Sequence, residues 1–264
     1  MKIAIMGKGG VGKTTLAAIL ARLYAAEGRP VLAVDADPDA NLGLALGFAA
    51  AALRKLTPVA AMNELIAERT GAAPGSFGLL FKINPLVADI PDRFSLTQNG
   101  VKLLVMGTVA TGGAGCVCPE HVVLRRLLQN LVMEREEVVI MDMEAGLEHL
   151  GRGTAAMVDR FVTVIEPGAR SVQTYEKIRR LAADLGVREV SAVANKVRGP
   201  ADEEFIRARI PAAALLGVIH YDDNVIRADK EGISPFELSP AVTGEIRGIK
   251  EAVGQPRRNE EAEG

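Results

Sequence analysis

The sequence predicts a doubly wound α/β fold with a mostly parallel sheet. Short runs rich in Val, Ile and Leu alternate with amphipathic helical patterns along most of the 264 residues. The apolar runs are continuous rather than alternating, which is typical of parallel strands buried on both faces. A glycine-rich loop joins the first apolar run to the first helical pattern. In such folds ligands bind at the carboxyl ends of the strands, so the loops after the apolar runs are the expected functional region.

The predicted strands are bounded by Gly, Pro or Asp, and helical patterns fill the intervals between them. The expected strands are residues 2–6, 30–34, 101–106, 138–141, 161–165, 190–194 and 215–219. The expected helices are residues 14–27, 119–135, 171–185 and 222–230. Residues 48–99 carry no clear pattern and are expected to form an insertion that lies on the sheet. We therefore expect a single domain over residues 1–254, followed by a polar, disordered tail at 255–264.

The charge balance argues against several classes of function. With 31 Lys and Arg against 33 Asp and Glu, the chain lacks the basic excess that an obligatory nucleic-acid partner requires. No apolar run is long enough to cross a bilayer, and the C-terminal tail lacks the apolar face of a membrane-binding helix. The chain opens with a strand pattern rather than a signal peptide. We expect a soluble cytoplasmic protein with no nucleic-acid partner and no membrane partner.

The stretch from Gly7 to Thr14 matches the phosphate-binding pattern G-x-x-x-x-G-K-[ST] between a strand and a helix. Glycines let backbone N–H groups curl around phosphates, and the positive end of the following helix faces them. Lys13 can reach the β- and γ-phosphates, while the Thr14 hydroxyl can hold Mg²⁺. A nucleoside triphosphate is therefore the expected ligand, and a plain glycine-rich turn is the alternative. The expected nucleotide-binding residues here are Gly7, Lys8, Gly9, Gly10, Val11, Gly12, Lys13, Thr14 and Thr15.

A second lysine distinguishes this loop. Lys8 follows the first glycine, so the pattern K-G-G-x-G-K-T places two lysines around one phosphate site. The loop resembles the deviant Walker A loop of the MinD/ParA/nitrogenase iron protein class, which are P-loop NTPases of the SIMIBI type. In that class the first lysine crosses a dimer interface to the partner's nucleotide and couples ATP to dimerisation. The resemblance implies catalytic roles for Lys8 and Lys13; the alternative is that Lys8 is a solvated loop charge.

Carboxylates follow two of the predicted strands. Asp35, Asp37 and Asp39 lie at the end of the second strand, and Asp142 ends a later one. A carboxylate that closes a buried strand is the Walker B arrangement, which holds Mg²⁺ through water. The pattern D-x-D-P resembles the first switch of the same class, in which the Asp before the proline, here Asp37, is catalytic and positions the attacking water near Mg²⁺. Thr14, Asp37 and Asp142 are thus the expected magnesium site, with solvated loop charges as the alternative.

Asn195 and Lys196 follow the strand predicted at residues 190–194. A side-chain amide can both donate to and accept from the edge of a purine. In the class that this chain resembles, an Asn at this place reads the adenine. The resemblance therefore implies that Asn195 and Lys196 contact the nucleotide, although an Asn-Lys pair by itself suits many other roles.

Cys116 and Cys118 lie two residues apart, between a glycine-rich stretch and a proline. Residues i and i+2 of an extended segment point to the same side, so both thiols can face one metal. Their Cα atoms would be roughly 7 Å apart, about the limit for an unstrained disulfide. Two ligands do not complete a tetrahedral or square-planar site, but a symmetric dimer would supply four. His121 could add a ligand. The alternative, a buried structural pair, is disfavoured by the flanking glycines and the expected exposure of the loop.

Together these segments resemble the CooC family from residue 1 to about residue 253. The resemblance rests on the deviant Walker loop, D-A-D-P-D-A-N-L, G-C-V-C-P-E and D-M-E-A-G-L-E-H-L-G-R. CooC proteins are accessory ATPases for nickel insertion into carbon monoxide dehydrogenase, and a maturation ATPase of acetyl-CoA synthase shares their features. The resemblance implies an ATPase that binds ATP, ADP and Mg²⁺ and forms a homodimer promoted by ATP and metal. It also implies Ni or Zn held between subunits by Cys116 and Cys118, and a carbon monoxide dehydrogenase-type client apoenzyme.

Two other classes stay open on the sequence. A positioning ATPase that acts on membrane or DNA would predict an apolar C-terminal helix or a basic surface, and the sequence has neither. An iron–sulfur carrier or scaffold could be bridged by the same four thiols. The nitrogenase iron protein uses two widely separated cysteines per subunit and the Mrp-type scaffolds use C-x-x-C, so the C-x-C spacing separates this chain from both. The sequence does not decide between Ni, Zn and an iron–sulfur cluster, nor does it identify the client.

Overall fold

The computed structural model describes residues 1–74, 80–107, 118–144, 152–187 and 189–255. In this part of the chain an eight-stranded sheet has the order β3-β4-β2-β5-β1-β6-β7-β8. Every neighbouring pair is parallel except β3 and β4. The strands are β1 (Lys2–Met6), β2 (Val31–Ala36), β3 (Leu96–Gln98), β4 (Val101–Val105), β5 (Val138–Met143), β6 (Arg160–Ile165), β7 (Ser191–Val197) and β8 (Leu215–His220). The predicted doubly wound, mostly parallel α/β fold is confirmed.

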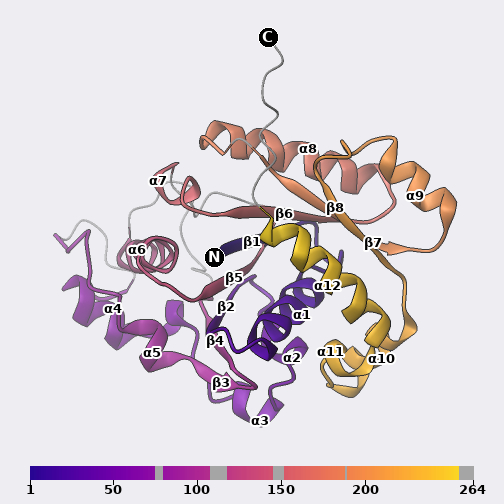
Figure 1. Cartoon of the computed structure of the whole chain (residues 1–264). Coiled ribbons are helices and arrows are strands. Elements are labelled where there is room, and N and C mark those ends of the chain that lie inside the picture. The colour runs from indigo at the N-terminus through magenta and orange to yellow at the C-terminus, as the bar shows by residue number, and fades with distance from the viewer. Residues whose placement is uncertain (75–79, 108–117, 145–151, 188, 256–264) are drawn as a thin grey trace.

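Helices cover both faces of the sheet (Figure 1). They are α1 (Lys13–Ala26), α2 (Leu42–Ala45), α3 (Ala50–Leu53), α4 (Asn63–Thr70), α5 (Ile90–Phe94), α6 (Pro119–Met133), α7 (Arg152–Ala155), α8 (Ala169–Asp184), α9 (Pro200–Arg207), α10 (Asp223–Glu231), α11 (Pro235–Leu238) and α12 (Pro240–Gly254), with the 3₁₀ turn η1 (Val59–Ala61). None of the described helices is both long enough and apolar enough to cross a membrane.

The central strands are apolar at most positions because each face of the sheet has its own core. In β1, Ile3 and Ile5 pack in one core with α1 and α12, while Ala4 and Met6 pack in the other with α6 and α8. All five residues of β1 are buried. This double burial is the physical reason why the continuous apolar runs of the sequence predict strands that lie between two layers of helices.

The seven predicted strands and four predicted helices are confirmed, with ends that differ by at most three residues. Outside residues 48–99, helices α2, α7, α9, α11 and α12 were not predicted, and neither was strand β3 at the end of that segment. Strand β3 is only three residues long and half polar, so it carries little pattern. Helix α9 is eight residues long, and α12 begins with Pro240 and contains two internal glycines, Gly244 and Gly248. Intrinsic helix propensity is low in such a segment, and packing against β8 and α1 stabilises it instead.

The described part of residues 48–99, a segment that had no clear sequence pattern, packs on the same sheet. Val59, Ile66 and Ile90 lie in the core beside α6, and β3 extends the sheet as an antiparallel edge strand next to β4. The predicted disordered tail was residues 255–264, of which residues 256–264 lie outside the described part of the chain.

Candidate functional site

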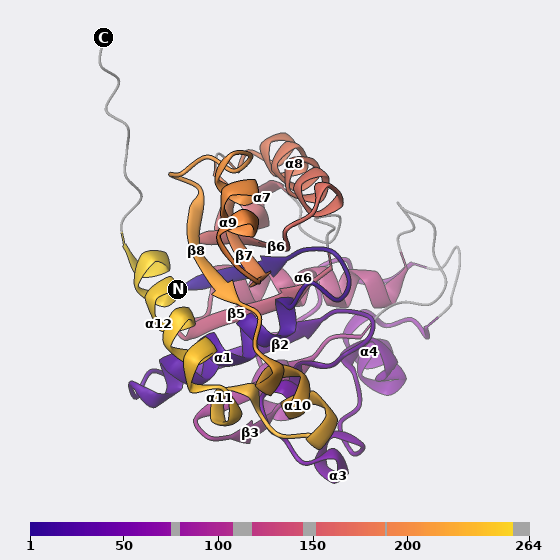
Figure 2. The same cartoon turned by 90° about the vertical axis from the view of Figure 1, so that its right-hand side faces the viewer.

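The loop from Gly7 to Gly12 joins β1 to α1 at the end of the sheet where the parallel strands terminate, as Figure 2 shows for the indigo loop. Two of its glycines have physical reasons to be glycine. Gly7 has a φ of +151°, and a Cβ there would lie 2.6 Å from the carbonyl oxygen of Val164. Gly12 has a φ of +100°, and a Cβ there would lie 2.1 Å from Nδ2 of Asn195. The loop therefore has the curvature and close backbone packing that a phosphate-binding loop needs.

Lys13, the first residue of α1, is 5% exposed and extends along this loop. Its Nζ lies 3.4 Å from Oδ2 of Asp37 and 3.5 Å from the carbonyl oxygen of Lys8. The ion pair joins the loop after β1 to the loop after β2, so Lys13 and Asp37 come together as predicted from the sequence. Lys8 itself is exposed, which leaves its side chain accessible to another molecule.

Asp142 and Thr14 form the centre of the predicted magnesium site. The Oγ1 of Thr14 donates to Oδ2 of Asp142 at 2.6 Å, across 128 residues of sequence. Within the described part of the chain, Oδ1 of Asp142 is buried and has no hydrogen-bond partner. Burial raises the pKa of Asp142 to about 6, and the Thr14 hydrogen bond opposes this shift. A buried, unpaired carboxylate oxygen beside a hydroxyl fits an octahedral Mg²⁺ that is held partly through water.

Asp37 follows β2 and faces the same site from the other side. Its Oδ1 accepts from the backbone N–H of Asp39 at 3.1 Å, and its Oδ2 is the partner of Lys13. The hydrogen bond fixes the rotation of the carboxylate, because it closes a turn of the backbone around the side chain. The structure thus brings three predicted residues, Lys13, Thr14 and Asp142, within reach of Asp37 at one end of the sheet.

Asn195 and Lys196, near the end of β7, lie against the outside of the phosphate-binding loop. Nδ2 of Asn195 donates to the carbonyl oxygen of Val11 at 2.8 Å. Lys196 has a φ of +59°, and its Nζ donates to the carbonyl oxygen of Gly10 at 2.5 Å. The contact with Asn195 fixes the plane of the peptide that carries the N–H of Gly12, whereas the N–H of Val11 donates to the carbonyl oxygen of Lys8 at 3.3 Å. The structure shows this backbone contact, and the expected adenine contact stays a prediction.

A cleft of about 950 Å³ opens from the phosphate-binding loop toward the end of β8. Its far wall contains residues that were not predicted from the sequence, among them Arg198, Tyr221 and Ile226. The guanidinium carbon of Arg198 lies 3.9 Å from the centre of the Tyr221 ring. These residues follow β7 and β8, and the rule that ligands bind at carboxyl ends of strands would have pointed to them. An aromatic ring and an aliphatic side chain are suited to hold the flat apolar face of a base.

The cysteine segment is only partly described. Cys118 has an extended backbone immediately before Pro119, which begins α6 as the first helical residue. The sequence predicted an exposed pair, but Cys118, directly before α6, is buried, with 3% exposure. That expectation is wrong for Cys118. Cys116 lies outside the described residues, as does the glycine-rich stretch before it. Among the residues described, no group of three or more His, Cys, Asp or Glu side chains is arranged to hold a metal.

Comparison with known proteins places this geometry in a family. A model of the CobQ/CobB/MinD/ParA nucleotide binding domain matches residues 2–236. The chain belongs to this family. It is 48% identical over 253 residues to the carbon monoxide dehydrogenase accessory protein CooC of Rhodospirillum rubrum, which covers 96% of each chain. It is also 44% identical to an uncharacterized ATP-binding protein of Methanocaldococcus jannaschii, over 94% of this chain and 96% of that one.

Solved structures of the family have the same fold. A chain of the MinC:MinD cell division protein complex from Aquifex aeolicus superposes with a TM-score of 0.67 at 16% identity, and 97% of each chain is covered. The cell division ATPase MinD of Pyrococcus furiosus gives a TM-score of 0.62 at 22% identity, over 96% of this chain and 98% of that one. The resemblance to CooC and to the MinD/ParA class of P-loop proteins that the sequence motifs indicated is confirmed.

Proposed function

We propose that this chain is a Mg-ATP-dependent ATPase that acts as a nickel-insertion or maturation factor for a carbon monoxide dehydrogenase-type enzyme. The observation that carries the proposal is the convergence of Lys13, Thr14 and Asp37 on one cleft, in a chain 48% identical to a carbon monoxide dehydrogenase accessory protein. Asp142 joins them through its hydrogen bond with Thr14. That similarity extends over 96% of both chains, so it includes the whole nucleotide site and the segment with the cysteines. We therefore propose for this chain the accessory role of that relative as a whole.

The site residues divide the work of hydrolysis. An entering triphosphate carries more negative charge than Asp37, so Lys13 exchanges its ion pair with Asp37 for the β- and γ-phosphates. The Asp37 carboxylate is then available to orient the attacking water. Thr14 and Asp142 would hold Mg²⁺ together with Asp37, and the bound ion supplies neutralisation of the phosphate charge. Backbone N–H groups of the loop, with the peptide of Val11 and Gly12 held by Asn195, complete the charge compensation.

We propose that ATP promotes a homodimer through Lys8. This lysine is exposed, and Lys13 already serves as the lysine that binds the phosphates within one chain. Light scattering with ATP under non-hydrolysing conditions tests this role. Wild type is expected to dimerise and Lys8→Ala to stay monomeric, whereas Lys177→Ala, an exposed lysine of α8, serves as the matched control. Equal dimerisation of Lys8→Ala and wild type would exclude the inter-subunit role.

Cys116 and Cys118 are proposed to bind Ni or Zn across the dimer axis, with one metal ion for two chains. Cys118 precedes α6, and the positive end of a helix favours the thiolate that binds metal. Anaerobic metal analysis with and without ATP is the test. The double variant Cys116→Ser, Cys118→Ser should keep nucleotide binding and lose the metal. One metal ion per monomer would exclude the shared site, and a brown, visibly absorbing protein would indicate an iron–sulfur cluster instead.

The client role is tested by activation of a nickel-free carbon monoxide dehydrogenase. Activation by Ni²⁺ should be faster with this protein and Mg-ATP than without them, and the double cysteine variant should give no acceleration. Equal activation with and without the protein would contradict the proposed role. An acceleration seen only with an acetyl-CoA synthase apoenzyme would assign the client to that related enzyme.

A further inference from the structure

Asp35 is a buried carboxylate beside the nucleotide site to which the proposed reaction gives no task. It lies in β2 and has 0% exposure. Its Oδ1 accepts from the backbone N–H of Asp37 at 3.3 Å, and its Oδ2 accepts from the backbone N–H of Leu42 at 2.9 Å. Asp37 is the first residue of the loop after β2, and Leu42 is the first residue of α2. One carboxylate therefore holds both ends of this loop.

The loop between these two contacts has no strand partner of its own and is folded around Asp37. The N–H groups of Asp39 and Ala40 donate to the side chain and to the carbonyl oxygen of Asp37, each at 3.1 Å. Ala40 has a φ of +46°, a region that residues other than glycine rarely adopt. A tight, unusual turn of this kind persists only where its surroundings fix it. The acceptor that fixes its two ends is Asp35.

The supports of the loop are themselves held in place. Beyond Leu42, α2 is fastened by Ser234, whose Oγ donates to the carbonyl oxygen of Ala45 at 2.7 Å. Arg22 of α1 donates to the carbonyl oxygen of Leu46 at 3.3 Å. On the other side, β2 pairs with β5 so that Asp35 lies opposite Asp142. The loop thus connects two elements with fixed positions, β2 and α2, and the side chain of Asp35 bonds to the backbone at both of its ends.

We propose that Asp35 is a positioning residue that sets the place of the Asp37 carboxylate relative to the phosphate-binding loop. This inference rests on the proposed ATPase function. A shift of about 1 Å in a reacting group can reduce a rate by about a hundredfold. Nucleotide affinity comes mainly from the loop at Gly7 to Thr14, which Asp35 does not contact. Loss of Asp35 should therefore lower kcat and leave nucleotide affinity nearly unchanged.

The test compares Asp35→Ala and Asp35→Asn with wild type in steady-state hydrolysis, nucleotide binding and backbone amide exchange across residues 35–46. Asp35→Ala removes both acceptors and should reduce kcat by about a hundredfold, with nucleotide affinity within about threefold. Asp35→Asn has nearly the same shape and keeps one acceptor, so it should lose about tenfold and should fold even if the alanine variant does not. In both variants the amides of Asp37 and Leu42 should exchange faster.

Asp92→Asn is the matched control, since it removes a hydrogen-bonded carboxylate at the opposite edge of the sheet, away from the nucleotide cleft. It should leave kcat and the exchange of residues 35–46 unchanged. Unchanged kcat in Asp35→Asn, equal losses in kcat and nucleotide affinity, or unchanged amide exchange would each overturn the proposal. If wild type itself fails to hydrolyse ATP, the proposed function fails, whereas the exchange measurement still decides whether Asp35 holds the loop.

Discussion

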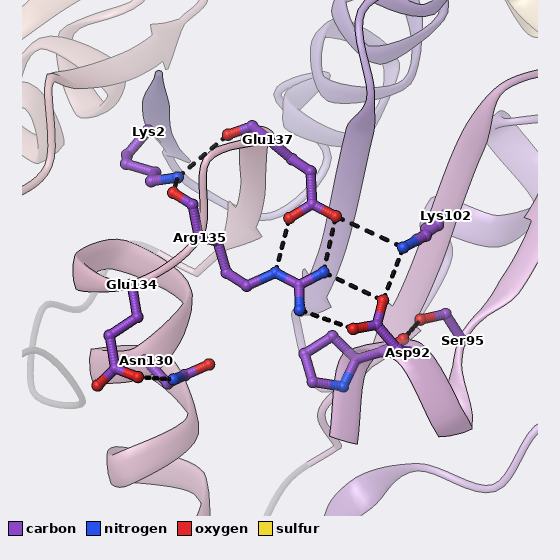
Figure 3. A network of polar contacts seen from close by, with 9 residues as sticks. Lys2, Asp92, Ser95, Lys102, Asn130, Glu134, Arg135 and Glu137 are labelled. Carbon is purple, nitrogen blue, oxygen red and sulfur yellow. Dashed lines mark hydrogen bonds and ion pairs between the residues drawn. The ribbon is translucent and has the colours of Figure 1, made fainter. Parts of the chain in front are cut away.

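At the carboxyl edge of the sheet, Asp35 and Asp142 are fully buried, whereas at the amino edge the carboxylates of Asp92 and Glu137 share an arginine and a lysine. Figure 3 shows the second arrangement, with the Arg135 guanidinium between the two acids. These contacts hold the pKa of Asp92 and of Glu137 below the usual range, mainly through hydrogen bonds from Arg135. Burial does the reverse at the carboxyl edge and raises the pKa of Asp35 to about 7.

This difference indicates that paired charges at the amino ends of the strands serve stability, whereas unpaired or buried carboxylates at the carboxyl ends serve function. Lys2 adds to the amino edge by donating to the carbonyl oxygens of Arg135 and Glu137, so the starts of β1, β4 and β5 are joined by a paired network. At the carboxyl edge, Oδ1 of Asp142 has no partner among the described residues, and Ala40 and Lys196 have left-handed backbones. Strain and unpaired charge concentrate where a ligand supplies the missing partner. Variants at the two edges should therefore have opposite effects.

The largest effect is expected from Lys13→Ala at the carboxyl edge. Lys13 supplies the charge that faces Asp37 in the empty site and the phosphates in the loaded one, so its loss should lower turnover by at least about a thousandfold. Phosphate release measures the change, and Lys102→Ala at the amino edge is the matched lysine control. Turnover of Lys13→Ala within tenfold of wild type would contradict the assignment of the site.

Asp37→Asn should separate binding from chemistry. The amide keeps the shape of the side chain but is a poorer acceptor for a proton of the attacking water, so hydrolysis should fall by about a hundredfold. Nucleotide affinity, measured by calorimetry, should stay within a few-fold of wild type because the phosphate-binding loop is intact. A loss of affinity as large as the loss of turnover would mean that Asp37 serves binding rather than hydrolysis.

Asp142→Asn should abolish magnesium-dependent turnover and yet stabilise the empty protein. In the native state the pKa of Asp142 is about 6, above its usual value, so folding favours the protonated form. Its ionisation therefore destabilises the fold increasingly as pH rises from about 4 to 7, and the asparagine variant avoids this loss. We expect a gain on the order of 2 kcal/mol at pH 8 and a smaller gain at pH 5, measured by thermal unfolding without nucleotide or Mg²⁺. An equal gain in stability over wild type at pH 5 and at pH 8 would contradict the explanation by a buried charge.

Asp92→Asn should have the smallest effect and the opposite sign. Asp92 is half exposed, so solvent screening limits the loss of stability at neutral pH to about 0.5–1 kcal/mol, and turnover should not change. The pKa of Asp92 is lowered in the native state, so its contribution is present above the unfolded value and is lost as pH falls through the native value. Chemical unfolding at pH 7 and near pH 2 should show a smaller difference between variant and wild type near pH 2 than at pH 7. A reduced turnover would place a functional role at the amino edge.

Much of the fold was predictable from the sequence because the signals are local. Continuous apolar runs such as Val138 to Met141 indicate strands buried on both faces, and the loop from Gly7 to Thr14 carries its own glycines, lysine and hydroxyl. Asp37 and Asp142 could be selected because each follows an apolar run, and the carboxyl ends of parallel strands share one edge. The short strand β3 and the glycine-containing helix α12 carry a weaker local signal, since their stability comes from packing against neighbours.

By itself, therefore, the sequence determined which segments form strands, where phosphate is expected to bind and which acids follow the strands, because these features depend on residues close together in the chain. The tertiary structure alone decided which of these residues meet. The order of strands brings Asp142 to Thr14 across 128 residues and places Asn195 against Val11 across 184. It also buries Asp35 between β4 and β5, where its two oxygens accept from the loop that carries Asp37. Strand order is set by the packing of the whole core, and no local pattern encodes it.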